Sequence, residues 1–175
     1  MVTVDKFGYY AIASMIAMGI IQLLYPVVNA LIPYAVKYKD DAYGLRSFNL
    51  KYAAVILVAI LFFSLVFIFF GLTFLNLWLN NELAAHQIYL LLNWLLIGSA
   101  LNALYTIGYI NWLIKGQTFK IFKVNLITLI VTIGLTPVLV INYGLFGACF
   151  GWIALNAIGL SFSINWLIPK RPLSD

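Results

Sequence analysis

The chain has 175 residues, of which 65% belong to the set Ala, Val, Ile, Leu, Met, Phe, Trp, Tyr and Cys and only 9% are charged, whereas soluble domains average about 25% charged residues. So few charges cannot cover the surface of a soluble domain of this size, and the basic residues behind the net charge of +5 are scattered between apolar runs rather than gathered on one face. The composition excludes a soluble enzyme, a nucleic-acid-binding protein and a disordered chain, and it predicts an integral membrane protein.

Charged residues divide the sequence into four long uncharged stretches, which predict the membrane spans. The stretches lie between Lys6 and Lys37, Lys51 and Glu82, Glu82 and Lys115, and Lys123 and Lys170. A helix needs about 20 apolar residues to cross the hydrocarbon core, so the first three stretches hold one span each. The fourth holds two, divided at the turn signal Asn142-Tyr143-Gly144. We therefore expect five transmembrane helices, at residues 8–35, 52–77, 88–113, 122–141 and 145–167.

These spans are predicted to be helices rather than strands of a membrane barrel. Residues 56–70 are apolar on every side, without the alternation of apolar and polar residues that a barrel strand requires. The predicted fold class is therefore all-α, a polytopic membrane helix bundle.

The basic residues predict the orientation of this bundle. Nine of the ten would lie on one side of the membrane: Lys37, Lys39, Arg46, Lys51, Lys115, Lys120, Lys123, Lys170 and Arg171. By the positive-inside rule these nine are cytoplasmic, which predicts a multi-pass membrane protein with its N-terminus outside and its C-terminus in the cytoplasm. Because the first residues lack the features of a signal peptide, we expect a hydrophobic helix upstream and a longer protein of which this chain is the later part.

The first span carries a polar stripe. Gln22, Tyr25, Asn29 and Pro33 recur at i, i+3, i+7 and i+11, which places them on one helix face that Pro26 flanks. Proline removes a backbone hydrogen bond, so Pro26 and Pro33 predict a helix bend. Two interpretations carry equal weight: the stripe lines a hydrophilic passage, or its amides form hydrogen bonds with a neighbouring helix.

The third span repeats this pattern with small and neutral polar residues. Gly98, Asn102, Tyr105, Thr106 and Tyr109 fall within a narrow arc of the helical wheel. This face is expected to be turned away from lipid. Asn102, Tyr105 and Tyr109 are candidates for lining a cavity that holds a polar substrate, although packing between helices is the favoured alternative.

Other residues indicate packing rather than chemistry. Gly147 and Gly151 have the spacing that lets two helix backbones approach closely, and they predict a helix-packing contact. No Asp, Glu, Lys or Arg is expected at mid-membrane depth, where a coupling residue would lie. His86 has only Glu82 close by in the sequence, and Cys149 is the single cysteine. We therefore predict no catalytic residue, no cofactor and no metal site.

Three stretches of the sequence resemble a known transporter family. They are residues 7–13 (FGYYAIA), residues 29–34 (NALIPY) with the basic loop that follows, and residues 142–152 (NYGLFGACFGW). In this order they resemble the C-terminal part of the O-antigen and polysaccharide flippases (Wzx-like), which belong to the superfamily of MATE-type multidrug exporters and lipid II flippases. Nearly the whole chain is covered by the resemblance.

The resemblance implies a fold of two helix bundles around a central cavity, in which these five spans form most of the second bundle. The implied activity is the flipping of undecaprenyl-diphosphate-linked oligosaccharide to the outer leaflet for surface polysaccharide synthesis. The implied partners are membrane lipid, this lipid-linked oligosaccharide, and a missing N-terminal bundle or another chain, without nucleic acid. The chain departs from the family pattern in lacking the first bundle and the cationic cavity residues.

Two other functions remain open from the sequence. One is a membrane enzyme of envelope glycan synthesis, such as a polymerase or an acyltransferase, which would need an acid, base or cation cluster in a loop or cavity. The other is a non-catalytic membrane scaffold.

Overall fold

The computed structural model describes the backbone of residues 4–167 and the side chains of all of these except residues 4, 5, 24, 27 and 28. Its long helices are α1 (Val4–Lys37), α2 (Ala42–Leu79), α3 (Glu82–Ile114), α4 (Thr118–Tyr143) and α5 (Leu145–Ser163), and a short 3-10 helix, η1 (Ile164–Trp166), follows. All five long helices are apolar enough over a sufficient length to cross a membrane. The all-α bundle of five spans is thus confirmed, and the chain is a multi-pass membrane protein.

Helices α1 to α4 extend beyond the predicted spans, whereas α5 ends at Ser163, before the predicted end at residue 167, because η1 follows it. The early starts of α2 and α3 come from local capping signals, which hydropathy does not detect. α2 begins at Ala42 rather than at residue 52, since the side chain of Asp41 accepts hydrogen bonds from the backbone N–H groups of Tyr43 and Gly44. Asn81 caps α3 in the same way by accepting a bond from the N–H of Ala84. The first turns of α2 therefore lie outside the apolar stretch on which the prediction depended.

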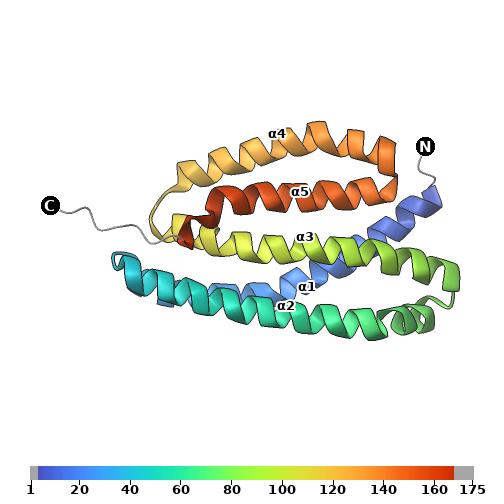
Figure 1. The fold of residues 1–175 in the computed structure, drawn as a ribbon, viewed down its shortest axis with the longest axis horizontal. Coiled ribbons are helices and arrows are strands. Elements are labelled where there is room, and N and C mark those ends of the chain that lie inside the picture. Colours follow the sequence, from blue (N-terminus) through green and yellow to red (C-terminus); the bar gives the residue numbers. More distant parts are fainter. Residues whose placement is uncertain (1–3, 168–175) are drawn as a thin grey trace.

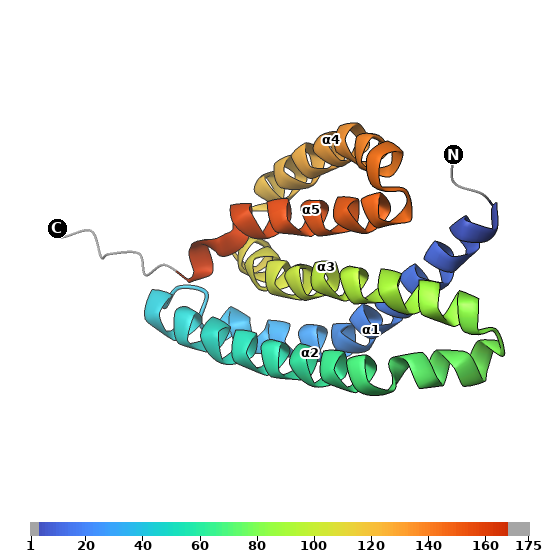
Figure 2. The ribbon, with the colours of Figure 1, turned by 45° about the vertical axis from the view of Figure 1, so that its right-hand side comes forward.

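α3 is the central helix of the bundle. Figure 1 shows α4 and α5 on one side of it and α2 on the other, with α1 crossing obliquely behind it, and Figure 2 shows the same arrangement from a second direction. α3 packs against α1, α2 and α5, whereas α4 packs mainly against α5. Fifteen residues of α3 are buried but only two of α4. α3 thus forms the core, and α4 lies at the edge.

Two apolar clusters lie along α3, one at each half. The first cluster joins residues 85–96 of α3 to Ala13 and Ala17 of α1, Leu75 of α2 and Cys149 of α5. The second joins residues 103–110 to the end of α1, the start of α2 and Trp166. Cys149 is fully buried in the first cluster, where it acts as a small apolar side chain.

The outer surfaces of α2 and α4 are strongly apolar. Large side chains that are more than 60% exposed include Phe62, Phe69 and Phe70 of α2 and Ile130 and Ile133 of α4. Extensive exposed apolar surface of this kind marks a membrane-facing region. α2 and α4 therefore present lipid-facing surfaces on two opposite sides of the bundle (Figure 1).

Glycine brings α4 and α5 together. A Cβ atom placed on Gly147 would overlap the backbone of Leu139 in α4, and one placed on Gly151 would lie 2.6 Å from Oγ1 of Thr136. Neither glycine leaves room for a side chain, so the two backbones approach more closely here than larger residues would allow. Both glycines lie where the helix-packing interpretation of the sequence expected them.

We predict that Gly147→Ala destabilises the bundle by about 1–3 kcal/mol, because the new methyl group would force α4 away from α5. Gly134→Ala is the matched control, since a Cβ on Gly134 of α4 would meet nothing within 4 Å. Thermal unfolding of the purified protein in detergent measures the effect. A lower Tm for Gly147→Ala alone is expected, and equal Tm values for the two variants would contradict the close contact.

Candidate functional site: the polar face of α1

The polar stripe of α1 faces away from the bundle. Ala13, Ala17 and Ile21 recur at intervals of four residues and form the buried face of this helix. Gln22 and Asn29 are exposed, and Tyr25 is 48% exposed. The packing of the small alanines against α3 thus turns the amide-bearing face of α1 outward.

The two prolines place freed backbone carbonyls on this same face. A proline in a helix cannot donate the bond to the carbonyl four residues earlier, and for Pro26 and Pro33 those carbonyls belong to Gln22 and Asn29. α1 nevertheless continues as one helix through both prolines. Figures 1 and 2 show it running obliquely past α3 and then turning to follow α2, in keeping with the expected bend.

The stripe needs a polar environment that the bundle itself does not supply. Among the described residues, no side-chain hydrogen bond involves Gln22, Tyr25 or Asn29. In hydrocarbon, each unpaired amide or carbonyl would cost several kcal/mol. This face is therefore suited to line water or a polar solute, or to pack against polar groups of another protein surface.

The candidate residues of α3 lie elsewhere, in contact with α4 and α5. The Nδ2 atom of Asn102 donates a hydrogen bond of 2.8 Å to Oδ1 of Asn156, whose own Nδ2 donates to the carbonyl of Trp152. The hydroxyl of Tyr105 donates a bond of 3.0 Å to Oδ1 of Asn125 in α4. The bonds of Asn102 to Asn156 and of Tyr105 to Asn125 each join two helices, which agrees with packing as the role of Asn102 and Tyr105.

The remaining members of the α3 face have different surroundings, and Gly98 meets α5 directly. A Cβ atom on Gly98 would overlap the indole ring of Trp152 in α5. Thr106 bonds to the carbonyl of Asn102 in its own helix, and Tyr109 packs against the second apolar cluster. The structure thus does not bring the α1 and α3 stripes together into one site.

Sequence reasoning did not single out Asn125 and Asn156, the partners of the α3 face. Asn156 is only 1% exposed and lies near the middle of α5, as Asn102 does in α3. Two amides at matching depth in neighbouring apolar spans are expected to pair, because lipid offers them no other partner. The matching depth of the two amides in their spans was therefore the signal in the sequence that could have identified this pair.

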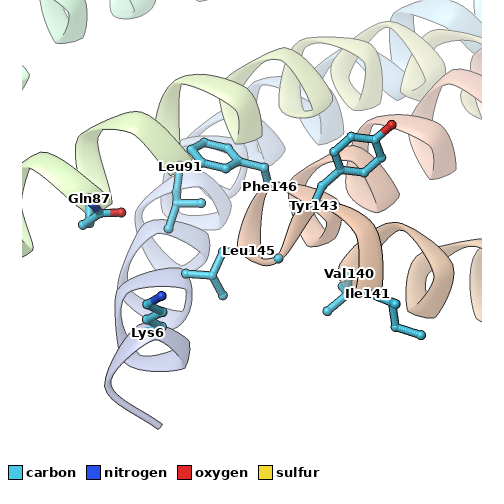
Figure 3. A pocket seen from close by; sticks show the side chains of 9 residues that line it. Lys6, Gln87, Leu91, Val140, Ile141, Tyr143, Leu145 and Phe146 are labelled. Atoms are coloured by element: carbon cyan, nitrogen blue, oxygen red, sulfur yellow. The ribbon is translucent and has the colours of Figure 1, made fainter. Parts of the chain in front are cut away.

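A cavity of about 480 Å³ lies at the end of the bundle that holds the N-terminal residues. Figure 3 shows Lys6 of α1 and Gln87 of α3 facing the turn between α4 and α5, with Leu91, Leu145 and Phe146 among the apolar lining residues. Its described lining holds one cation, Lys6, and no Asp, Glu, His or Cys. Within residues 4–167, no three His, Cys, Asp or Glu side chains gather where they could hold a metal ion.

We predict that cysteines at Gln22 and Asn29 react with a small, membrane-impermeant hydrophilic thiol reagent when the protein is assembled in membranes. A cysteine at Leu65 is the control, because this α2 residue is 52% exposed on the apolar outer surface and should face lipid. Thiols react as thiolates in water, so lipid protects them. All variants carry Cys149→Ala. Protection of positions 22 and 29 equal to that of position 65 would show that the stripe lines no water-filled passage.

Comparison of the chain with protein-family models, with curated proteins and with solved structures found no match.

Proposed function

We propose that this chain forms one bundle of a MATE-like transporter that flips undecaprenyl-diphosphate-linked oligosaccharide across the inner membrane, for O-antigen or another surface polysaccharide. Two features support the proposal: the resemblance of residues 7–13, 29–34 and 142–152 to this family, and an outward polar face on α1. The activity involves no covalent chemistry on the substrate.

The exposed stripe of α1 is the observation that carries the proposal. An oligosaccharide presents many hydroxyl groups that both donate and accept hydrogen bonds, and Gln22, Tyr25 and Asn29 offer matching neutral groups. The freed carbonyls of Gln22 and Asn29 add acceptors on the same face. A neutral, amide-rich wall suits a sugar chain that must pass without being held tightly.

A second bundle, in the same polypeptide or in another chain, is part of the proposal. A diphosphate with several sugars must be shielded from hydrocarbon on all sides while it crosses the membrane. In this bundle one polar wall is open to the outside, so a facing bundle is needed to close the passage. Alternating access then arises as the two bundles rock against each other.

The proposed orientation follows from the ends of the helices. The start of α2, the end of α3 and the start of α4 lie together at one end of the bundle, while the N-terminal end of α1 lies at the other (Figure 1). The first end carries Arg46, Lys115, Lys120 and Lys123, and the other carries Lys6. The positive-inside rule favours a cytoplasmic location for the first end.

Transport is tested in a bacterial strain that lacks its own flippase and therefore displays no surface polysaccharide. The chain together with its second bundle is expected to restore the polysaccharide, measured by surface staining. Gln22→Leu and Asn29→Leu should each reduce the restored amount several-fold, because an apolar wall offers the sugar no hydrogen bonds. Thr73→Leu, which replaces an exposed polar residue of α2, is the matched control and should leave it unchanged.

Two outcomes of this experiment would contradict the proposal. If a correctly inserted two-bundle assembly restores no polysaccharide, the flippase hypothesis is excluded, and the scaffold and enzyme hypotheses remain. Restoration by the 175-residue chain alone would show that no separate second bundle is needed.

Orientation is tested by cysteine labelling in intact cells, in a Cys149→Ala background. Ser47→Cys and Gln117→Cys should resist an impermeant thiol reagent because they lie at the basic, cytoplasmic end. Asn81→Cys, in the turn between α2 and α3, should react. Labelling of position 117 from outside would overturn the orientation.

A further inference from the structure

A second cavity, of about 420 Å³, lies at the basic end of the bundle. It is enclosed by the start of α2, the end of α3, the start of α4 and the segment in which α5 passes into η1, which meet at one end of the molecule in Figure 1. Three of its lining residues are cations, Arg46, Lys115 and Lys120, and its described lining includes no Asp or Glu. We refer to it as the basic cavity.

Among the described residues, no Asp or Glu forms an ion pair with the cations of the basic cavity. In the described part of the chain, the only ion pair joins Lys39 to Asp40, which are both outside the cavity. Nζ of Lys120 lies 4.8 Å from the ring centroid of Trp112, and Nε of Arg46 donates a hydrogen bond to the carbonyl of Leu167. Three like charges around one small space repel each other, so an anion placed between them would be stabilised.

The start of α4 adds to the positive potential. Its N-cap residue, Gln117, makes no side-chain capping bond, and its first turn holds no acidic residue. The free N–H groups and the helix dipole therefore present partial positive charge. Gln117 and Lys120 both line the cavity, so this helix end borders the space that the cations surround.

Buried polar side chains on the wall of the cavity also lack partners. Trp166 and Asn111 are each only 9% exposed, and Nε1 of Trp166 and Oδ1 of Asn111 have no hydrogen-bond partner in the described structure. Indole N–H is only a donor, so it requires an acceptor such as a phosphate oxygen, whereas the amide oxygen requires a donor such as a hydroxyl. An occupant with both a phosphate and hydroxyl groups would match them.

The position of the cavity indicates where such an occupant comes from. The cavity lies at a common end of helices that span the membrane, at the level where lipid headgroups reside. Phe119 and Phe122 flank Lys120 along α4 and are 67% and 60% exposed, which offers an apolar surface beside the cations. Basic pockets between transmembrane helices at the cytoplasmic surface are suited to anionic lipid headgroups.

We propose that the basic cavity binds the headgroup of an anionic phospholipid, with the phosphodiester among Arg46, Lys115 and Lys120 and a headgroup hydroxyl toward Asn111. Phosphatidylglycerol has this chemistry. The bound lipid joins the ends of α2, α3 and α4, where these cations would otherwise repel each other. The site does not depend on which substrate, if any, the protein transports.

The proposal is tested by titrating the purified chain in detergent, at about 0.3 M salt, with phosphatidylglycerol or with phosphatidylcholine of the same acyl chains. Bound lipid is counted by native mass spectrometry. At this ionic strength, attraction between exposed charges is largely screened. The chain is expected to bind phosphatidylglycerol at least tenfold more tightly than phosphatidylcholine. Equal binding of the two lipids would overturn the proposal.

Matched variants distinguish lipid binding in the cavity from attraction by general surface charge. The triple variant Arg46→Gln, Lys115→Gln and Lys120→Gln should bind phosphatidylglycerol at least tenfold more weakly, since each cation contributes roughly a factor of five. The control triple variant Lys37→Gln, Lys51→Gln and Lys123→Gln removes the same charge outside the cavity and should change the affinity less than twofold. If both triple variants weaken phosphatidylglycerol binding equally, the lipid is attracted only by general surface charge, and the proposed site is wrong.

A charge-conserving variant and two further ligands complete the test. Arg46→Lys, Lys115→Arg and Lys120→Arg should retain binding, which distinguishes loss of charge from loss of folding. If inorganic phosphate at the same concentration binds as tightly as phosphatidylglycerol, the cavity is a site for a soluble anion. Tighter binding of farnesyl diphosphate than of phosphatidylglycerol would assign it to a transported isoprenyl diphosphate. Either result would overturn the lipid assignment.

Discussion

The packing of α3 against every other helix is the constraint on which the rest of this bundle depends. In a bilayer, apolar side chains gain little by leaving lipid for one another, so helices associate through close fit and through hydrogen bonds. α3 supplies both. Gly98 and Gly108 admit Trp152 and Ser163 of α5 against its backbone, and Asn102 bonds to Asn156 between the two apolar clusters.

This central packing sorts the polar residues of the spans into groups with different environments. The amides between α3 and α5 are paired, with Asn156 buried and Asn102 half-buried, and they hold the two helices in register. The amides of α1 are exposed on a face that no other helix of the bundle covers. The cations gather at the end, where four chain segments enclose the basic cavity. The three groups thus correspond to cohesion of the bundle, to the proposed substrate passage and to the proposed lipid site.

α1 combines a tightly packed face with a face on which some backbone carbonyls lack their helical hydrogen bonds. Ala13 and Ala17 are small enough to bring it close to α3, while Pro26 and Pro33 release the carbonyls of Gln22 and Asn29 on the other side. Discontinuous or bent helices with freed backbone groups are typical of binding surfaces in secondary transporters. The same helix can therefore belong to a stable bundle and still offer hydrogen bonds to a solute.

Local patterns determined the helices, whereas contacts between distant residues were decided by the tertiary structure. Long apolar runs predicted five spans, and periodicity placed Gln22, Tyr25 and Asn29 on one face, because both signals lie within a single segment. That face points outward because α3 packs against the alanine face of α1, and this packing could not be read from the sequence of one segment. Asn102 bonds to Asn156, 54 residues later, and Arg46, Lys115 and Lys120 come from α2, the turn after α3, and α4. Hydropathy and spacing within one segment carry no information on how helices are rotated and paired, and these are fixed only when side chains pack.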